Sequence, residues 1–205
     1  MARHELKYEL VGDGDLKRIR ALRSFSNVKV GELGGFVESE NNLSQYDNSW
    51  IYDDAWVYNK ALVFGDAEVS GNARVFGDAR VYDKAMVFGD AEVSENARIY
   101  GTAGVFGDAW ISDSAEVYGD AKVYGDAWVS DSADVSGDAE VAGSSEVYGN
   151  AKVYGYAWIH GNAKVSGNAK VSGHACVFRQ ALVHGYAWVS GNDWVSGDDE
   201  IIGVV

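Results

Sequence analysis

Branched aliphatic residues recur at every sixth position over about three quarters of the chain. Starting at Ile51 and stepping by six, all 26 positions through Ile201 are Val or Ile. Ala stands four residues after this position in 22 of 25 units, and Gly stands two residues after it in 19 of 26 units. A short fixed period of this kind is typical of a solenoid, in which each repeat packs on its neighbours. The pattern therefore predicts one continuous stack of coils.

The repeated unit, V-[Y/F/S]-G-[D/N]-A-x, predicts a short strand followed by a sharp corner. Val points inward, its two neighbours point outward, and Gly or Asn accepts the positive φ that a corner requires. Three six-residue sides close a triangular coil, so we expect an all-β, single-stranded parallel β-helix of eight to nine coils. At a strand spacing of about 4.8 Å the rod is roughly 40 Å long. Because Val and Ala fill this narrow interior, we expect function to reside on the outer surface.

Residues 1–44 lack the repeat and are interpreted as a small N-terminal β-rich cap, which leaves 45–205 as the β-helix. Residues 6–11 alternate in the manner of a strand, 12–15 form a turn, and 16–22 fit either a strand or a short helix. Ser49 stands in the Ala position of the repeat, so the first coil is expected to begin before Ile51. A solenoid needs such a cap to cover its exposed end.

The V-x-G-D-A-x units resemble the hexapeptide-repeat family, whose members fold as left-handed parallel β-helices. Residues 16–44 further resemble the N-terminal part of uncharacterised bacterial and prophage hexapeptide-repeat proteins that are labelled as transferases. The resemblance implies a left-handed coil. The best-known members are trimeric acyltransferases with a catalytic His near a subunit boundary, a loop that leaves the coil and a C-terminal helical region. This sequence contains no insertion in any unit and no helical segment after Ile202.

The net charge of −14 lies almost wholly in the repeats, because residues 51–205 hold ten Lys and Arg against 23 Asp and Glu. An acidic rod is repelled by nucleic acid and by anionic membranes, so neither is expected as a direct partner. Such a rod attracts a basic protein surface. The alternative is that the charge keeps an elongated sheet protein soluble.

Cys176 is the only cysteine, so no disulfide within the chain is possible and a reducing compartment is favoured. It stands at an outward position, and an exposed thiol is expected. No run approaches the roughly 18 apolar residues of a membrane helix. The first ten residues lack the apolar core of a signal peptide. We therefore expect a location in the cytoplasm of a bacterial host.

The histidines of the repeat predict no catalytic site. His160, His174 and His184 replace residues that vary freely in other units. A general base needs a partner, and the stacking column of His160 offers only Ala142 and Phe178. We expect a non-enzymatic protein without a cofactor. If the protein is an acyltransferase, His160 and His184 are the residues to suspect.

Stacking by 18 residues places outward aromatic side chains in columns. One side gathers Met86, Phe88, Phe106 and Tyr124 around Gly104. Another holds Trp56, Trp110 and Trp128, beside the column of Ser94, Ser112 and Ser130. A third carries the aromatic column Phe64, Tyr82, Tyr100 and Tyr118, beside a column of charges in which Arg98 meets Glu116 and Asp134 meets Lys152. Exposed Trp, Phe and Met exceed what an isolated rod needs and mark a partner surface, for a foreign protein or for a dimer or trimer of the chain.

Two further surfaces are candidates for contact. Asp90, Asp108 and Asp126 stack at one corner as an acidic ridge. Carboxylates in such a row fit a hard cation, but Asn replaces Asp at other corners, so we expect each Asp to satisfy its own turn and predict no metal site. The ridge also resembles the charge of a nucleic-acid backbone. At the C-terminal end, Ile201, Ile202, Val204 and Val205 are expected to be uncovered and to form an oligomer contact.

The sequence thus favours a non-catalytic, protein-binding solenoid of bacterial or phage origin. Its sharpest form is an acidic inhibitor that mimics nucleic acid and binds a host protein. An acyltransferase relative and a structural, self-assembling component stay open as alternatives.

Overall fold

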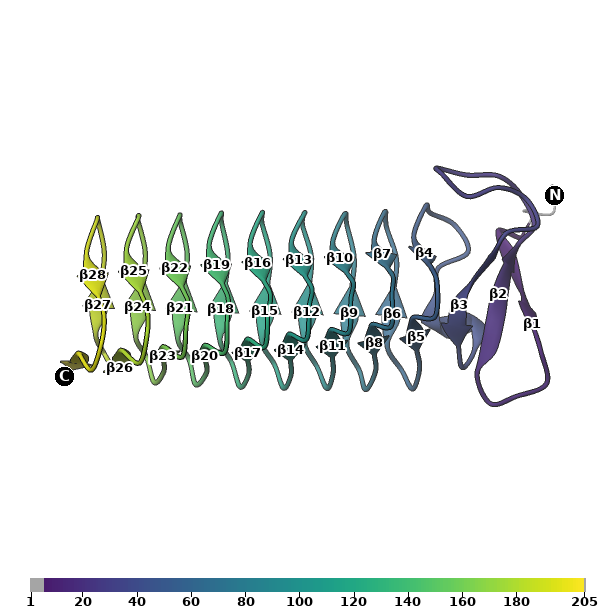
Figure 1. The fold of residues 1–205 in the computed structure, drawn as a ribbon. Coiled ribbons are helices and arrows are strands. Elements are labelled where there is room, and N and C mark those ends of the chain that lie inside the picture. The colour runs from purple at the N-terminus through teal and green to yellow at the C-terminus, as the bar shows by residue number, and fades with distance from the viewer. Residues whose placement is uncertain (1–5, 205) are drawn as a thin grey trace.

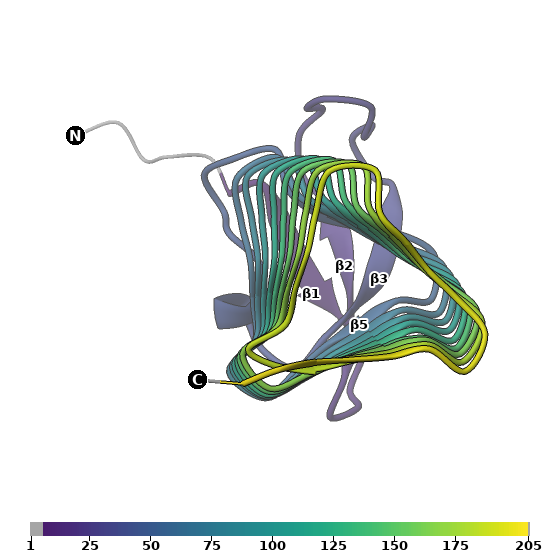
Figure 2. The same cartoon turned by 90° about the vertical axis from the view of Figure 1, so that its left-hand side faces the viewer.

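The structure, a computed structural model, describes residues 6–204 and confirms the predicted solenoid. Figure 1 shows the coils side by side in a straight rod, with β1 to β3 at the N-terminal end. In Figure 2 the chain turns clockwise as it advances toward the viewer at its C-terminal end, so the solenoid is left-handed. Three sheets of parallel strands form the faces of the rod and enclose the core. One of these sheets has nine strands, one from each of nine coils.

Each face is named here after its first repeat strand. The β5 face follows β1 (Tyr8–Val11), β2 (Lys17–Ala21) and β3 (Leu33–Val37) and contains β5 (Trp56–Val57), β8 (Arg74–Val75), β11 (Glu92–Val93), β14 (Trp110–Ile111), β17 (Trp128–Val129), β20 (Glu146–Val147), β23 (Lys164–Val165), β26 (Leu182–Gly185) and β29 (Glu200–Gly203). The β4 face contains β4 (Trp50–Ile51), β7 (Glu68–Val69), β10 (Met86–Val87), β13 (Gly104–Val105), β16 (Lys122–Val123), β19 (Glu140–Val141), β22 (Trp158–Ile159), β25 (Cys176–Val177) and β28 (Trp194–Val195). The β6 face contains β6 (Leu62–Val63), β9 (Arg80–Val81), β12 (Arg98–Ile99), β15 (Glu116–Val117), β18 (Asp134–Val135), β21 (Lys152–Val153), β24 (Lys170–Val171) and β27 (Trp188–Val189).

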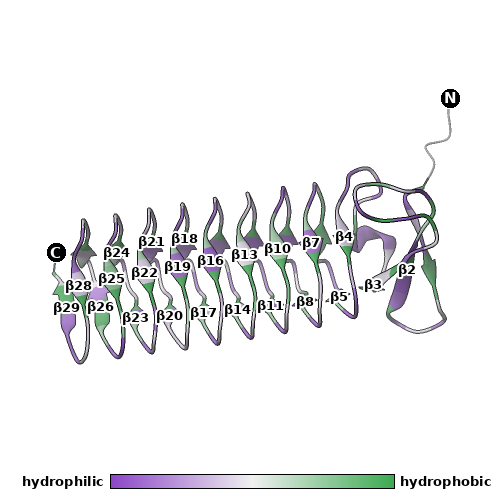
Figure 3. Ribbon diagram, turned by 45° about the horizontal axis from the view of Figure 1, so that its top comes forward, coloured by the Kyte–Doolittle hydropathy of each residue, from purple (hydrophilic) through white to green (hydrophobic). Residues whose placement is uncertain are grey.

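The core consists of the inward Val or Ile and the Ala of each unit. Val87 pairs with Val105 eighteen residues later, and both are fully buried. The backbone N–H on either side of Val87 donates to the next coil, from Met86 to Ala103 at 2.9 Å and from Phe88 to Val105 at 3.0 Å. Figure 3 shows hydrophobic and hydrophilic residues within the same short strands, as one inward and one outward side chain require.

At each corner of a coil, one residue has a positive φ. Gly89 has φ +76°, and a Cβ there would lie 3.0 Å from the backbone N of Gly107 in the next coil. Asp replaces Gly at some corners, where its carboxylate accepts a backbone N–H from the next coil: Asp83 from Gly101 at 3.3 Å and Asp131 from Gly149 at 2.9 Å. Asp is one of the few residues that tolerate this conformation.

The N-terminal segment forms an antiparallel sheet that continues into the β5 face. β1 pairs with β2 and β2 with β3, both antiparallel, and β3 then pairs in parallel with β5. Residues 16–22, left open between strand and helix, contain strand β2. Between β3 and β4 lies a short 3-10 helix, η1 (Glu40–Asn42), and Ser49 is fully buried in its Ala-like position. The division between residues 44 and 45 stays a prediction.

The stacked columns on the β6 face are confirmed. The rings of Phe64, Tyr82, Tyr100 and Tyr118 stack at centroid distances of 4.9, 5.0 and 4.8 Å. Beside them, Arg98 pairs with Glu116 at 3.2 Å and Lys152 with Asp134 at 3.9 Å.

Candidate functional site

Outward positions on the β5 face carry the predicted column of Trp residues. Trp56, Trp110 and Trp128 are 40%, 46% and 43% exposed. Trp110 and Trp128 belong to the paired strands β14 and β17, and their rings stack with centroids 5.6 Å apart. Trp56 lies in the same column but is separated from this pair by Arg74 and Glu92. The structure therefore brings two of the three indoles into contact.

A row of buried serines lies beneath the two stacked indoles. Ser94 accepts a hydrogen bond from the indole N–H of Trp110 at 3.5 Å, and Ser112 accepts one from Trp128 at 3.4 Å. The two serines are 3% and 7% exposed. Each contact joins residues sixteen apart, because one side chain follows its inward Val and the other precedes the Val of the next coil. Sequence columns eighteen residues apart do not show this diagonal neighbour.

A cleft of about 300 Å³ opens beside Trp128, where the row of Trp residues ends. The next strand of the face, β20, presents Glu146 opposite Trp128. Glu146 also forms an ion pair with Lys164 at 2.9 Å. The residues that line the cleft are Asp113, Trp128, Ser130, Asp131, Glu146 and Tyr148. Two aromatic side chains and three carboxylates thus line a single cleft.

The β4 face carries the other predicted aromatic group. Phe88, Phe106 and Tyr124 stack at 4.7 and 4.9 Å, and Met86 stands in the strand opposite Gly104. Met86 and Phe88 are 44% and 37% exposed, whereas Phe106 and Tyr124 are half-buried. Burial, together with the hydrogen bond that Tyr124 donates to Glu140 at 3.1 Å, raises the pKa of Tyr124. The four residues lie together, as predicted, but only the first two present large exposed surfaces.

Sequence columns missed an aromatic cluster nearer the C-terminal end of the β4 face. The ring of His160 stacks on Trp158 at 4.2 Å and on Phe178 at 5.1 Å. Phe178 meets Trp194 edge to face at 5.8 Å. A cleft of about 390 Å³ lies among Tyr156, Trp158, His160, His174, Cys176, Phe178 and Trp194. Two signals in the sequence could have revealed this cluster: aromatic residues recur at outward positions of these units, and residues sixteen apart are neighbours in adjacent coils.

Two expectations about His160 and Cys176 were wrong. Cys176 is only 8% exposed, because the neighbouring rings cover its outward position. His160 does have a polar neighbour, since its Nε2 lies 3.6 Å from the Cys176 Sγ. Burial lowers the pKa of His160 and raises the pKa of Cys176, so both groups are uncharged at neutral pH. The pair therefore lacks the thiolate and imidazolium of an activated cysteine.

His184 also has a partner that its column did not reveal. Its Nε2 lies 2.8 Å from Oε1 of Glu200, again sixteen residues away. The side chains are about one third and one half exposed. A carboxylate beside an imidazole is the arrangement that orients a general base.

The acidic ridge and the C-terminal residues are exposed in the structure. Asp90, Asp108 and Asp126 are exposed at successive corners, and Asp90 accepts a hydrogen bond from the Asn72 amide at 2.9 Å. Ile201, Ile202 and Val204 are 38%, 55% and 87% exposed in and after β29. Val205, predicted with them as an oligomer contact, lies outside the described residues.

Within residues 6–204, no group of three or more His, Cys, Asp and Glu side chains is arranged to hold a metal ion. No helix in this described part of the chain has the length and apolar character needed to cross a membrane.

One family model matches the chain. It describes the YdcK beta solenoid repeat and matches residues 67–83, slightly less than one coil. The chain is thus similar to a β-solenoid repeat in this segment, in agreement with its fold. A comparison with curated proteins gives no match.

Proposed function

We propose that this protein is a non-catalytic, protein-binding solenoid that engages a basic surface of its partner through the β5 face. The observation that carries the proposal is the cleft in which Trp128 faces the carboxylates of Asp113, Asp131 and Glu146. Exposed Trp residues are typical anchors of protein interfaces, and the stacked pair with Trp110 presents two of them together.

Charge supports a basic partner. The chain carries 31 acidic residues against 17 Lys and Arg, for a net charge of −14. Charge complementarity raises association rates and selects against acidic surfaces. An acidic inhibitor that occupies the nucleic-acid site of a bacterial host protein, in the cytoplasm and of phage or prophage origin, is the most specific form of this proposal. In that form the relation to hexapeptide-repeat transferases is one of fold.

The test is capture of partners on the immobilised full-length chain from nuclease-treated bacterial lysate, with low-salt and high-salt washes and identification by mass spectrometry. We expect a basic protein that high salt releases and that added DNA displaces. Trp110→Ala should weaken its capture by about tenfold or more, whereas the matched variant Trp188→Ala on the β6 face should leave it unchanged. Equal capture by both variants would contradict the assignment to the β5 face. Recovery of nothing except further copies of the chain would replace the proposal with the self-assembling structural component.

A second candidate, an acyltransferase relative, is favoured by one observation. The contact between His184 and Glu200 at 2.8 Å supplies the partner that a general base needs. Calorimetric titration with acyl-CoA tests it. Saturable binding, with acyl transfer abolished by His184→Ala and retained by Cys176→Ala, would support this candidate over the binding protein.

A further inference from the structure

We propose that the cleft beside Trp128 binds the guanidinium group of an arginine side chain of the protein partner. The inference rests on the proposed function and adds the chemical group that the β5 face recognises.

The row of serine and indole contacts stops one step early at the cleft. Ser94 and Ser112 each accept an indole N–H from the following coil, but the residue in the equivalent place over Ser130 is Glu146. Ser130 is 7% exposed and its hydroxyl has no hydrogen-bond partner among residues 6–204. Ser130 lines the cleft, so its hydroxyl can accept a hydrogen bond from a donor that enters there.

The indole of Trp128 favours a planar donor, because a planar group can stack on its ring. The indole stacks on Trp110 on one side, and on the other side the next position of the column carries Glu146, which lines the cleft together with Trp128. A planar group with N–H donors at its edge could both continue the stack and donate to Ser130. An indole and a guanidinium both meet this description.

The same face already contains a guanidinium that lies between a Trp ring and a carboxylate. Arg74 lies over the ring of Trp56, with its Cζ 5.7 Å from the centroid, and its Nη1 lies 3.2 Å from Oε1 of Glu92 in the next strand. Trp56, Arg74 and Glu92 thus form a ring, a cation and a carboxylate in succession. At the cleft Glu146 lies on the strand directly next to Trp128, so no described residue of the chain supplies a cation between this ring and this carboxylate, and a partner would supply it.

The carboxylates of the cleft favour a guanidinium cation over a neutral indole as the bound group. Asp131 directs Oδ2 to the backbone N–H of Gly149, and Asp113 directs Oδ2 to the Asp131 backbone N–H. These bonds hold both side chains at corners with φ of +59° and +58°. Glu146 adds a third negative charge, shared with Lys164. A guanidinium can stack on the ring, donate to Ser130 and pair with a carboxylate at once, whereas a lysine ammonium has no plane to stack.

The test is NMR titration of the full-length, ¹⁵N-labelled protein with N-acetylarginine amide, read at the indole N–H of Trp128, which Trp128→Phe assigns. We expect a saturable shift with a dissociation constant in the range of about 1 to 50 mM. N-acetyllysine amide should bind at least about fivefold more weakly, and the uncharged isostere N-acetylcitrulline amide should give no saturable shift. Lysine binding as tight as arginine, or no saturable arginine shift at Trp128, would overturn the proposal.

Two variants test the position of the binding site while Trp110 and Trp128 stay in place. Ser130→Ala should weaken arginine binding severalfold, because it removes a hydrogen-bond acceptor from the cleft. Glu146→Trp should abolish binding and keep the fold, because the new indole continues the stack and donates to Ser130 in the manner of Trp110 and Trp128. Trp188→Phe on the β6 face is the matched control and should change nothing. Undiminished binding by Glu146→Trp would place the site elsewhere.

The two proposals fail in different ways. A basic partner that Trp110→Ala releases, combined with no arginine shift at Trp128, leaves the protein-binding function in place and removes the arginine pocket. An arginine shift at Trp128, combined with no captured basic protein, removes the proposed function and leaves a guanidinium site without an identified source.

Discussion

The N-terminal cap and the coils are stabilised in different ways. In the coils most layers repeat a buried Val or Ile and a buried Ala, and the contacts of one layer are nearly those of the next. The cap, β1 to β3 with the loop to β4, depends on single residues that occur once: Tyr8, Phe25, Trp50 and the buried Lys7. A repeated structure spreads its stability over many equivalent interfaces, whereas the cap concentrates it in a few. Single substitutions should therefore act more strongly on the cap.

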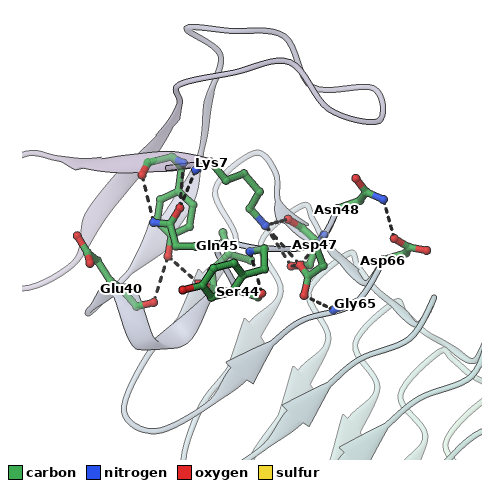
Figure 4. A network of polar contacts seen from close by, with 12 residues as sticks. Lys7, Glu40, Ser44, Gln45, Asp47, Asn48, Gly65 and Asp66 are labelled. Carbon is green, nitrogen blue, oxygen red and sulfur yellow. Dashed lines mark hydrogen bonds and ion pairs between the residues drawn. The ribbon is translucent and has the colours of Figure 1, made fainter. Parts of the chain in front are cut away.

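Lys7 shows how specific the cap contacts are. Figure 4 shows its ammonium reaching the loop before β4, where it donates to the backbone carbonyl of Ser49 at 2.8 Å and lies 3.5 Å from Asp47 Oδ1. It also lies over the ring of Phe25, 5.3 Å from the centroid. Burial lowers the pKa of Lys7 from 10.5 to about 8, although the charge of Asp47 opposes the shift.

The largest effect is expected at Trp50, which joins the two regions. It is fully buried in the first strand of the β4 face and meets Tyr8 and Phe25 edge to face at 6.2 and 5.4 Å. Trp50→Ala should lower the free energy of unfolding by about 3 to 5 kcal/mol, measured by denaturant titration. Val28→Ala in the cap and Val117→Ala in the coils remove the same side chain from two buried positions, and the cap variant should cost more. An equal loss in the two variants would contradict the distinction between cap and coils.

The second effect is a pH dependence that belongs to the cap. Because the folded pKa of Lys7 is about 8 and its ordinary value is 10.5, the unfolded chain binds more protons between these values. The contribution of Lys7 to the free energy of unfolding should therefore rise with pH from 8 to 10, by about 1 kcal/mol per pH unit, and it is read as the difference between the wild type and a variant without this amine. Below pH 8 the buried ammonium is charged in both states, and its unfavourable contribution is constant.

Lys7→Met isolates this contribution. The variant should lose the rise between pH 8 and 10, measured by denaturant titration at each pH. Subtracting the two pH profiles removes the opposite effect of the tyrosines, whose pKa values burial raises above 10, as at Tyr8 and Tyr52, and which make stability fall with pH in both proteins. If the rise persists in Lys7→Met, the titrating group is another one.

The sequence predicted the coils well because their rule is a period. Val at every sixth position identified the inward residues, and stacking by 18 predicted the aromatic and charge columns, including the contact of Arg98 with Glu116. The same rule could not show diagonal neighbours, so it missed Ser112 beneath Trp128 and Cys176 beside His160. Both contacts depend on the direction of side chains in adjacent coils.

The cap had no period to read. Alternation over residues 6–11 indicated a strand, but the burial of Lys7 depends on Ser49 and Asp47, about forty residues later. The cleft beside Trp128 was also missed. It lies where the column of Trp residues changes to Glu146, and the spacing of the repeat does not show that a cleft results.

The third effect compares the loss of stability when a glycine with positive φ is replaced by alanine in the cap and in the coils. Gly89 in the coils and Gly31 in the cap both have positive φ, at +76° and +84°. A Cβ at Gly89 would meet the backbone N of Gly107 at 3.0 Å, whereas a Cβ at Gly31 would meet nothing within 4 Å. Gly31→Ala should cost about 1 kcal/mol from conformation alone, and Gly89→Ala about 2 kcal/mol, since it adds the contact with the next coil. Equal losses in thermal or denaturant unfolding would show that stacking between corners does not resist a side chain.

The smallest effect is expected on the exposed charge column of the β6 face, where repetition leaves little to lose. Arg98 pairs with Glu116 at 3.2 Å, and its side chain is 51% exposed. Arg98→Ala should lower the free energy of unfolding by no more than about 1 kcal/mol, and high salt should remove most of that difference. Arg80 stands opposite Arg98 in the preceding strand and has no ion pair within residues 6–204, so Arg80→Ala should be neutral or slightly stabilising because it removes a like charge. A loss at Arg98 as large as that at Trp50 would mean that the coils, too, depend on single contacts.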